Sequence, residues 1–263
     1  MNKNAYKSFD IAYSIGDTCA ASLYLRRLQM RFASGPLDWL AGGTLHTRTQ
    51  MITSDFKLFM EESDLELRER DFGYGIDFPH DYYFNTSNGL KHYHDFKKGI
   101  PLAETYPAVR EKYNRRIARF QRDLSTKRVL LIWFSMGQSH SDEEVLSCCE
   151  QILHKYEANR QNIHFLIIEH SSHPPQSNQL SFNILRYNIG TPDETSRDFN
   201  TTMGNMQRIS PIFTRYAVRN SRTLLRRKKI KRFIIRALTV LIPTKKWRRE
   251  ARRKMYGQSE ITW

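Results

Sequence analysis

Cysteine is scarce in this 263-residue sequence, which contains only Cys19, Cys148 and Cys149. An odd number of cysteines with one adjacent pair does not suit a disulfide framework, so we expect a reducing compartment. No apolar run reaches the length of about eighteen residues that a transmembrane helix needs, and no such helix is expected. The first residues also lack the apolar run of a signal peptide. We therefore expect a cytoplasmic protein, bound peripherally to the inner face of the membrane.

Acidic residues are scarce in one part of the chain. The net charge is +15, and from Arg215 to Lys254 there are seventeen Lys and Arg but a single acid, Glu250. The rest of the chain has 25 basic and 26 acidic residues, a net charge of about −1. This distribution argues against a basic nucleic-acid-binding domain and favours a separate electrostatic segment near the C-terminus.

Residues 1–205 are predicted to form an α/β domain, with a layered mixed sheet and flanking helices. Hydrophobic residues make up 40% of the chain, enough for a packed core. Apolar runs alternate with helical patterns, which favours some parallel strand pairing. Ser141 is expected to cap one of the helices. Strands are expected at 8–15, 129–134, 163–169 and 180–187, short strands and loops at 71–96, and helices at 18–28, 44–62, 106–123 and 142–156.

Residues 206–263 are predicted to form a basic, amphipathic helical tail. Pro243 should end a first helix, and Thr244 should cap a second one over 245–256. An apolar stripe between basic flanks is typical of a helix in the headgroup layer, so we expect residues 215–256 to bind an anionic membrane surface. The alternatives are a helix packed on the core of the protein and, less favoured, binding of RNA or DNA. The apolar residues at three- and four-residue steps are Ile230, Phe233, Ile234, Leu238, Leu241 and Ile242.

Cys19 stands where a predicted strand passes through a glycine turn into a predicted helix. The unpaired amides and the dipole at a helix N-terminus favour a thiolate, so this position predicts a lowered pKa for Cys19. The same amides can hold a developing oxyanion. The alternative is that Cys19 is a small buried hydrophobe. Cys148 and Cys149 fall in the middle of a predicted helix and are expected to be structural.

A nucleophilic cysteine needs a base, which is usually histidine. His92 and His94 lie in an alternating segment whose period of two places both, with Phe96, on one strand face. No third ligand completes a metal site with them, and we expect neither a metal nor another cofactor. His140 and His170 follow apolar strands, where α/β proteins often place functional groups.

The sequence resembles a bacterial family of unknown function that is described as papain-like cysteine peptidases. The family pattern is S-x-G-x-x-C, then S-x-P-F-D-W, then an H-D-F block ahead of a K-Y-x-R-R helix, and the resemblance covers about residues 9–135. Leu37 departs from it, because the family usually has Phe there. The matching residues are Ser14, Gly16, Cys19, Leu25, Arg26, Arg31, Ser34, Pro36, Asp38, Trp39, His94, Asp95, Phe96, Lys112, Tyr113, Arg115 and Arg116. The tail separately resembles the basic endings of enzymes that build lipopolysaccharide and capsule.

The resemblance implies that Cys19 is the nucleophile and His94 the general base, with Asp38 or Asp95 as the orienting acid. Asp95 adjoins His94 on the strand and should point to the opposite face, so Asp38 is preferred. The implied activity is that of a membrane-associated thiol hydrolase or acyltransferase in bacterial cell-surface polysaccharide assembly, on a glycan, lipid or peptide substrate that the sequence does not identify. The alternatives are a glycan-pathway transferase, although no Asp-x-Asp pair is found, and a non-catalytic membrane-tethered scaffold.

Overall fold

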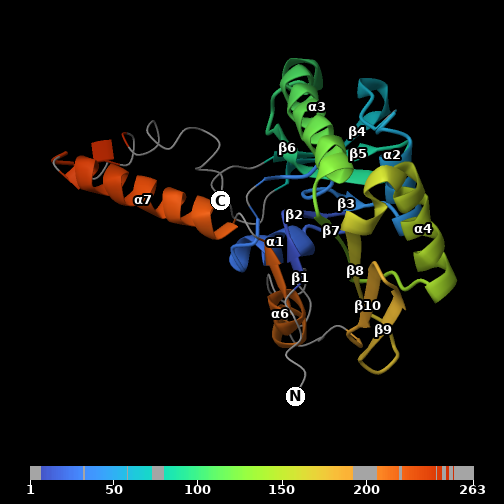
Figure 1. Cartoon of the computed structure of the whole chain (residues 1–263). Helices are drawn as coiled ribbons and strands as arrows, with labels where there is room; N and C mark the ends of the chain where they lie inside the picture. Colours follow the sequence, from blue (N-terminus) through green and yellow to red (C-terminus); the bar gives the residue numbers. More distant parts are fainter. Residues whose placement is uncertain are drawn as a thin grey trace. The chain divides into compact units, whose positions relative to one another are not determined.

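The computed structural model describes residues 7–31, 33–57, 59–72, 80–191, 206–218, 221–240, 242–244, 247–248 and 251. The chain divides into two compact units, residues 1–219 and residues 220–263. The first unit contains all of the strands and most of the helices described (Figure 1).

The first unit is built on a five-stranded sheet with the order β2-β7-β8-β10-β9. Strands β2, β7, β8 and β10 are parallel, and β9 runs antiparallel along the edge of β10. Because parallel strands end at the same edge, the segments that follow β2, β7, β8 and β10 come together there. The strands are β2 (Ile11–Ser14), β7 (Val129–Ser135), β8 (Ile163–Glu169), β9 (Gln176–Ser181) and β10 (Ile184–Asn188).

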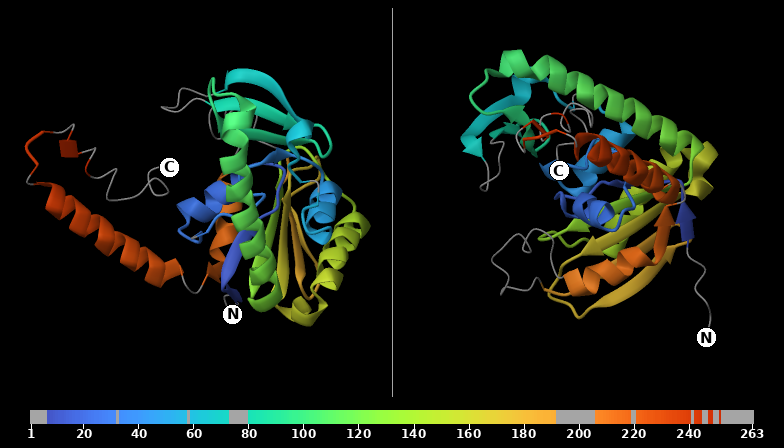
Figure 2. Two further views of the ribbon diagram at one scale, coloured as in Figure 1. Left: turned by 90° about the horizontal axis from the view of Figure 1, so that it is seen from above. Right: turned by 90° about the vertical axis from the view of Figure 1, so that its left-hand side faces the viewer.

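A four-stranded antiparallel sheet of order β3-β6-β5-β4 adjoins this core, and it carries the histidine-rich segment. Its strand β6 packs against the long helix α3, and two further views show the sheet beside this helix (Figure 2). The single strand predicted at 180–187 is in fact a hairpin of two strands, β9 and β10. The strands of this second sheet are β3 (Ala41–Gly42), β4 (Leu65–Phe72), β5 (His80–Asn85) and β6 (Leu90–Lys97).

The helices largely follow the sequence pattern, and the expected α/β architecture is confirmed. The predicted cap of α4 is a full capping box, in which Ser141 and Glu144 bond each other's backbone amides. The helix expected over 44–62 is wrong in length, because Asp55 and Phe56 adopt positive φ values that end it. The helices are α1 (Ala20–Arg27), α2 (Leu45–Thr53), α3 (Leu102–Thr126), α4 (Asp142–Lys155), α6 (Met206–Thr214) and α7 (Ser221–Val240), with short 3₁₀ turns at Glu62–Asp64 and Glu157–Asn162.

Residues 206–218, which the sequence groups with the tail, belong to the first unit. There α6 leads into β11 (Tyr216–Val218), and β11 pairs in parallel with β1 (Lys7–Phe9). The strand predicted at 8–15 is therefore two strands, because Asp10 interrupts it between β1 and β2.

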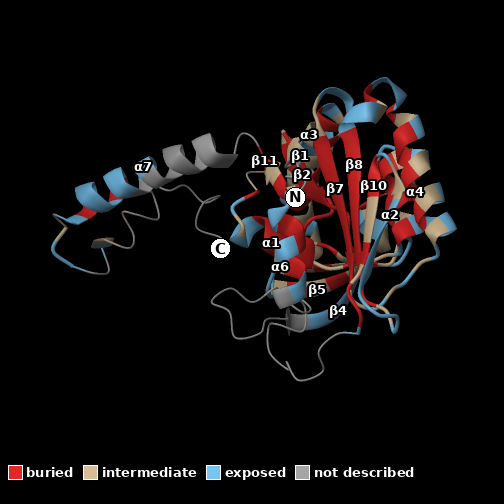
Figure 3. Cartoon of the chain, turned by 60° about the horizontal axis from the view of Figure 1, so that its bottom comes forward, coloured by how far each residue is buried: buried red, intermediate tan, exposed pale blue. Residues whose placement is uncertain are grey.

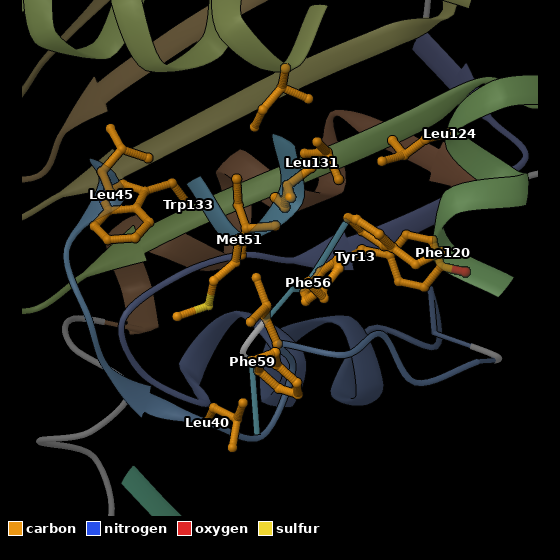
Figure 4. Packing of buried hydrophobic residues seen from close by; sticks show 14 of the residues in the cluster. Tyr13, Leu40, Leu45, Met51, Phe56, Phe59, Phe120, Leu124, Leu131 and Trp133 are labelled. Atoms are coloured by element: carbon orange, nitrogen blue, oxygen red, sulfur yellow. The ribbon is translucent and has the colours of Figure 1, made fainter. Parts of the chain in front are cut away.

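Two hydrophobic cores cover the two faces of the main sheet. Its strands β2, β7 and β8 are buried along their length, whereas the edge strand β9 is mostly exposed (Figure 3). One core joins the sheet to α2, α3 and α4. In it Tyr13 packs edge-on against Phe120, and Trp133 is fully buried (Figure 4). The other core joins the sheet to α1 and α6. A sheet buried on both faces explains why β7 and β8 are continuous apolar runs.

The described part of the second unit consists mainly of α7. Of its apolar side chains, Ile230, Phe233, Ile234 and Leu238 are exposed. Leu241, and most of the second helix predicted at 245–256, lie outside the described residues; Thr244 Oγ1 does accept the backbone amide of Trp247 at 3.3 Å, as expected for a cap. None of the helices described is both long and apolar enough to cross a membrane.

Candidate functional site

Cys19 lies at the start of α1, just beyond the carboxyl end of β2. The turn before it is tight, because Gly16 lies directly against the backbone of Phe134 in β7. The backbone of Asp17 hydrogen-bonds Phe134 and Gly42, which holds the turn between the two sheets. Cys19 is a free thiol of intermediate exposure that packs against the α1 side of the core. Strand, glycine turn and helix therefore follow one another as the sequence predicts.

The electrostatic prediction for this thiol is wrong. Burial raises the pKa of Cys19 instead of lowering it, and no charged group offsets that effect. Desolvation penalises the thiolate more than the start of a short helix stabilises it. Cys19 is therefore a neutral thiol at pH 7, and its use as a nucleophile requires a base.

His94 lies on β6 in a part of the strand that departs from regular pairing. Asp81 pairs with Phe96 and Tyr83 with His92, so residues 93–95 bulge opposite a single residue of β5. The bulge breaks the expected alternation: His92 and Phe96 are fully buried, whereas His94 is of intermediate exposure. Burial lowers the pKa of His94, although the charge of Asp95 opposes this effect. His94 is thus a neutral imidazole at pH 7, the form that accepts a proton.

Asp95 binds three partners, and His94 is not among them. Its carboxylate receives hydrogen bonds from Lys112 Nζ at 2.6 Å and Tyr113 OH at 2.8 Å, and lies 2.9 Å from His92 Nδ1. Burial by itself would raise the pKa of Asp95, but Lys112 and His92 outweigh burial and hold that pKa well below its usual range. The bulge turns Asp95 toward His92, which the simple strand pattern did not predict.

Asp38 is equally buried and holds the loop that follows α1. It accepts the backbone amides of Ser14 at 3.0 Å and Gly35 at 2.8 Å, and pairs with Arg31 Nε at 3.2 Å. Within the described ranges, no hydrogen bond joins Asp38 or Cys19 to His94. The structure therefore places the four predicted residues around the β2–α1 turn and the second sheet, without linking them by hydrogen bonds.

Asp17 is a polar residue of this turn that the sequence did not single out. Its carboxylate accepts a hydrogen bond from Ser135 Oγ at 2.8 Å and one from Gln138 Nε2 at 3.2 Å. Burial raises the pKa of Asp17, and the hydrogen bond from Ser135, the charge of Arg48 and a backbone hydrogen bond from Met136 only partly offset that effect. The only sequence feature that points to Asp17 is its position in the turn after β2, where parallel sheets often place functional residues.

A second polar cluster lies where β7, β8 and β10 end. Glu169 is 1% exposed, and its carboxylate contacts His140 Nδ1 at 2.6 Å, Trp133 Nε1 at 3.1 Å and Arg186 at 2.7 Å. His170 is also buried, with Nδ1 3.1 Å from the carbonyl of Ser135, and burial lowers its pKa. His170 directly follows β8, as expected, whereas His140 lies in the loop that joins β7 to α4. A cavity of about 250 Å³ opens here, lined by Ser139, His140, Asp142, Ser171, His173, Gln176, Asn178, Arg186 and Asn188.

Comparison with known proteins identifies a family whose profile matches this chain. The profile of the family described as "Putative papain-like cysteine peptidase (DUF1796)" matches residues 10–172. "Uncharacterized protein R408" of Acanthamoeba polyphaga mimivirus is 24% identical over 170 residues, covering 60% of this chain and 76% of the viral protein. No solved structure matches the chain. The family match includes the four predicted site residues but ends before the basic tail, and the relative is viral, so neither comparison supports a bacterial origin.

Proposed function

The chain belongs to the family of papain-like cysteine peptidases whose profile matches residues 10–172, and from that premise we propose that it is a thiol hydrolase with Cys19 as its nucleophile. The exposure of the three cysteines supports the choice of Cys19 as the nucleophile. Cys148 and Cys149 are buried inside α4, at 6% and 1% exposure, whereas Cys19 is more exposed and stands at the functional edge of a parallel sheet.

The chemistry follows from the protonation states. His94 Nε2 or Nδ1 takes the thiol proton, and the Cys19 sulfur then attacks a carbonyl carbon. The imidazolium returns the proton to the leaving group, which leaves an acyl-enzyme that water hydrolyses. The charge of Asp95 favours the imidazolium, since it raises the pKa of His94. Asp38 is the alternative orienting acid, and an acceptor other than water makes the same site an acyltransferase.

A chromogenic ester such as p-nitrophenyl acetate tests this proposal, because a nucleophilic thiol releases a burst of product before the slow hydrolysis step. We expect a burst of about one equivalent from the native chain and none from Cys19→Ala. Cys148→Ala is the matched control and should keep the burst. An undiminished burst from Cys19→Ala would refute the proposal.

The pH profile tests the role of His94 separately. With His94 as base, the acylation rate should rise to a plateau below neutral pH, because burial lowers the pKa of that imidazole. In His94→Ala the rate should instead increase about tenfold per pH unit through neutrality, since only the thiolate fraction of a high-pKa cysteine reacts. Identical profiles for the two proteins would remove His94 from the mechanism.

We further propose that the tail holds this hydrolase to an anionic membrane surface. Its support is the exposure of Ile230 at 58%, Phe233 at 73% and Leu238 at 57% along α7, among basic residues. An exposed apolar stripe stabilises a helix in the headgroup layer, and each nearby Lys or Arg adds about 1 kcal/mol. A place in cell-surface polysaccharide assembly remains a prediction from the composition of the tail.

Vesicle sedimentation at ~0.1 M salt tests the membrane proposal. Phe233→Glu should weaken binding to mixed phosphatidylglycerol and phosphatidylcholine vesicles about tenfold or more. The change removes an aromatic ring that inserts into the headgroup layer on binding, and it adds a negative charge. Phe182→Glu is the matched control, because Phe182 is 74% exposed on the β9–β10 hairpin. Equal binding by both variants, or binding to RNA in preference to vesicles, would contradict the proposal.

A further inference from the structure

Two arginines from distant parts of the chain meet at one residue, Ser34. Arg31, in the loop after α1, donates a hydrogen bond to Ser34 Oγ. Arg119, in the middle of α3, donates a hydrogen bond to the carbonyl oxygen of Ser34 at 2.5 Å. Because both guanidinium groups bond the same residue, two positive charges are held near each other, where like charges repel.

Two further arginines add to this positive charge. Burial lowers the pKa of Arg31; Asp38 opposes that effect, and the charges of Arg116, Arg26 and Arg119 reinforce it. The Arg116 guanidinium lies over the ring of Tyr113, 5.2 Å from its centroid. We call Arg26, Arg31, Arg116 and Arg119 the arginine cluster.

Fewer negative than positive charges face the arginine cluster. Tyr13 interacts with Arg119 and donates to Asp123, but Asp123 is already paired with Lys127 at 3.0 Å and Arg122 at 3.4 Å. In the ranges that the structure describes, its one ion pair is that of Arg31 with Asp38. The Asp38 carboxylate is already shared with the backbone amides of Ser14 and Gly35. The cluster around His140 differs, because Arg186 there is matched by Asp142 and Glu169. A balanced group of ion pairs needs no ligand, whereas the arginine cluster carries excess positive charge.

One donor in the arginine cluster is buried and unsatisfied. Arg119 Nε has no hydrogen-bond partner in the structure, although water does not reach it. A buried N–H without an acceptor is costly and calls for an explanation, of which a missing anion is one. Guanidinium groups present planar, paired N–H donors that match the oxygens of phosphate.

We propose that the arginine cluster binds a tetrahedral oxyanion, either free phosphate or a phosphoryl group carried on a larger molecule. The ligand oxygens accept N–H groups of the guanidinium groups in the cluster and neutralise the charge that Asp38 leaves uncompensated. The cluster shares Asp38 with the residues considered for the hydrolase, but Cys19 lies at the opposite end of α1. Phosphate binding therefore does not require the proposed hydrolase activity.

Isothermal titration of the full chain with inorganic phosphate, at constant ionic strength, tests the site. The native protein should bind phosphate, and Arg119→Gln and Arg116→Gln should each weaken the binding about tenfold, as expected for loss of one charge-assisted hydrogen bond. Arg115→Gln is the matched control: Arg115 lies on the same helix, is 62% exposed and pairs with Glu111. A parallel titration with glycerol 3-phosphate distinguishes the sources, because tighter binding than that of inorganic phosphate identifies a carried phosphoryl group.

Thermal melting separates ligand binding from a structural role. In phosphate-free buffer, Arg26→Gln should melt at or above the temperature of the native protein, since it relieves repulsion at an exposed position. Phosphate should then raise the melting temperature of the native protein and of Arg115→Gln, and raise that of the cluster variants much less. The proposal is overturned if the native chain binds no phosphate, or if the cluster variants bind it as well as Arg115→Gln does.

Discussion

Replacement of Asp95 by alanine should lower the free energy of unfolding by about 3–5 kcal/mol at pH 7. The side chain of Asp95 is 3% exposed and is bound by Lys112, His92 and Tyr113. Removing one partner of a buried charge network leaves the others uncompensated, which costs more than the pair contributed. Urea unfolding followed by tryptophan fluorescence measures the change, since Trp133 is fully buried in the core.

Glu111→Ala provides the comparison, on the helix α3 that supplies Lys112 and Tyr113 to Asp95. Glu111 is 70% exposed and pairs with Arg115, so its loss should cost less than about 1 kcal/mol. The loss of unfolding free energy in Asp95→Asn should lie between the losses in Glu111→Ala and Asp95→Ala. The amide keeps a similar shape but loses the charge that Lys112 faces. If Asp95→Ala were no less stable than Glu111→Ala, the network would contribute little to stability.

The pH dependence of this effect has a definite sign. Lys112 and His92 hold the pKa of Asp95 well below its usual range in the folded protein, while an unfolded aspartate titrates near about 3.9. The stabilisation is therefore fully present above about pH 5 and is lost as the pH falls through about 4 toward the folded pKa. The difference in stability between the native protein and Asp95→Ala should shrink in that acidic window and stay constant above it.

Short-range sequence patterns correctly predicted those strands and helices whose formation depends on neighbouring residues. Strands β7 and β8 are continuous apolar runs because the sheet is buried on both faces, and α4 begins at a Ser–Glu capping box that can be found by spacing alone. The end of α2 was missed because Phe56 adopts a positive φ, which is rare for a bulky residue and which the surrounding packing must impose.

The candidate site was predictable in position but not in electrostatics. The strand, glycine and helix pattern located Cys19, yet its pKa depends on how deeply the folded core buries the thiol. The contact between His92 and Asp95 arises from the bulge in β6, and its register is set by the pairing with β5. The contacts of Glu169 have a similar origin: its partners are His140, in the loop after β7, and Arg186, in β10, and only the sheet order brings them together.

Gly16→Ala should be the most damaging single methyl addition in the turn that carries Cys19. A Cβ at position 16 would lie 2.5 Å from the backbone oxygen of Phe134 and 2.6 Å from its nitrogen. Phe134 cannot move away easily, because β7 is paired with β2 on one side and β8 on the other. The turn must therefore shift, and we expect a loss of about 3 kcal/mol or more in unfolding free energy, at the upper end for overpacking.

Gly137→Ala is the matched control for this substitution, because it adds the same methyl group in the turn after β7 with no atom within 4 Å. It should change the unfolding free energy by less than about 0.5 kcal/mol. The displaced turn in Gly16→Ala should also move Cys19, so the p-nitrophenyl acetate burst should fall in that variant and persist in Gly137→Ala. Equal unfolding free energies of the two variants would show that the β2–α1 turn can shift to accommodate the methyl group without loss of stability. A stable Gly16→Ala protein with a full burst would mean that the position of Cys19 against β7 does not matter for its chemistry.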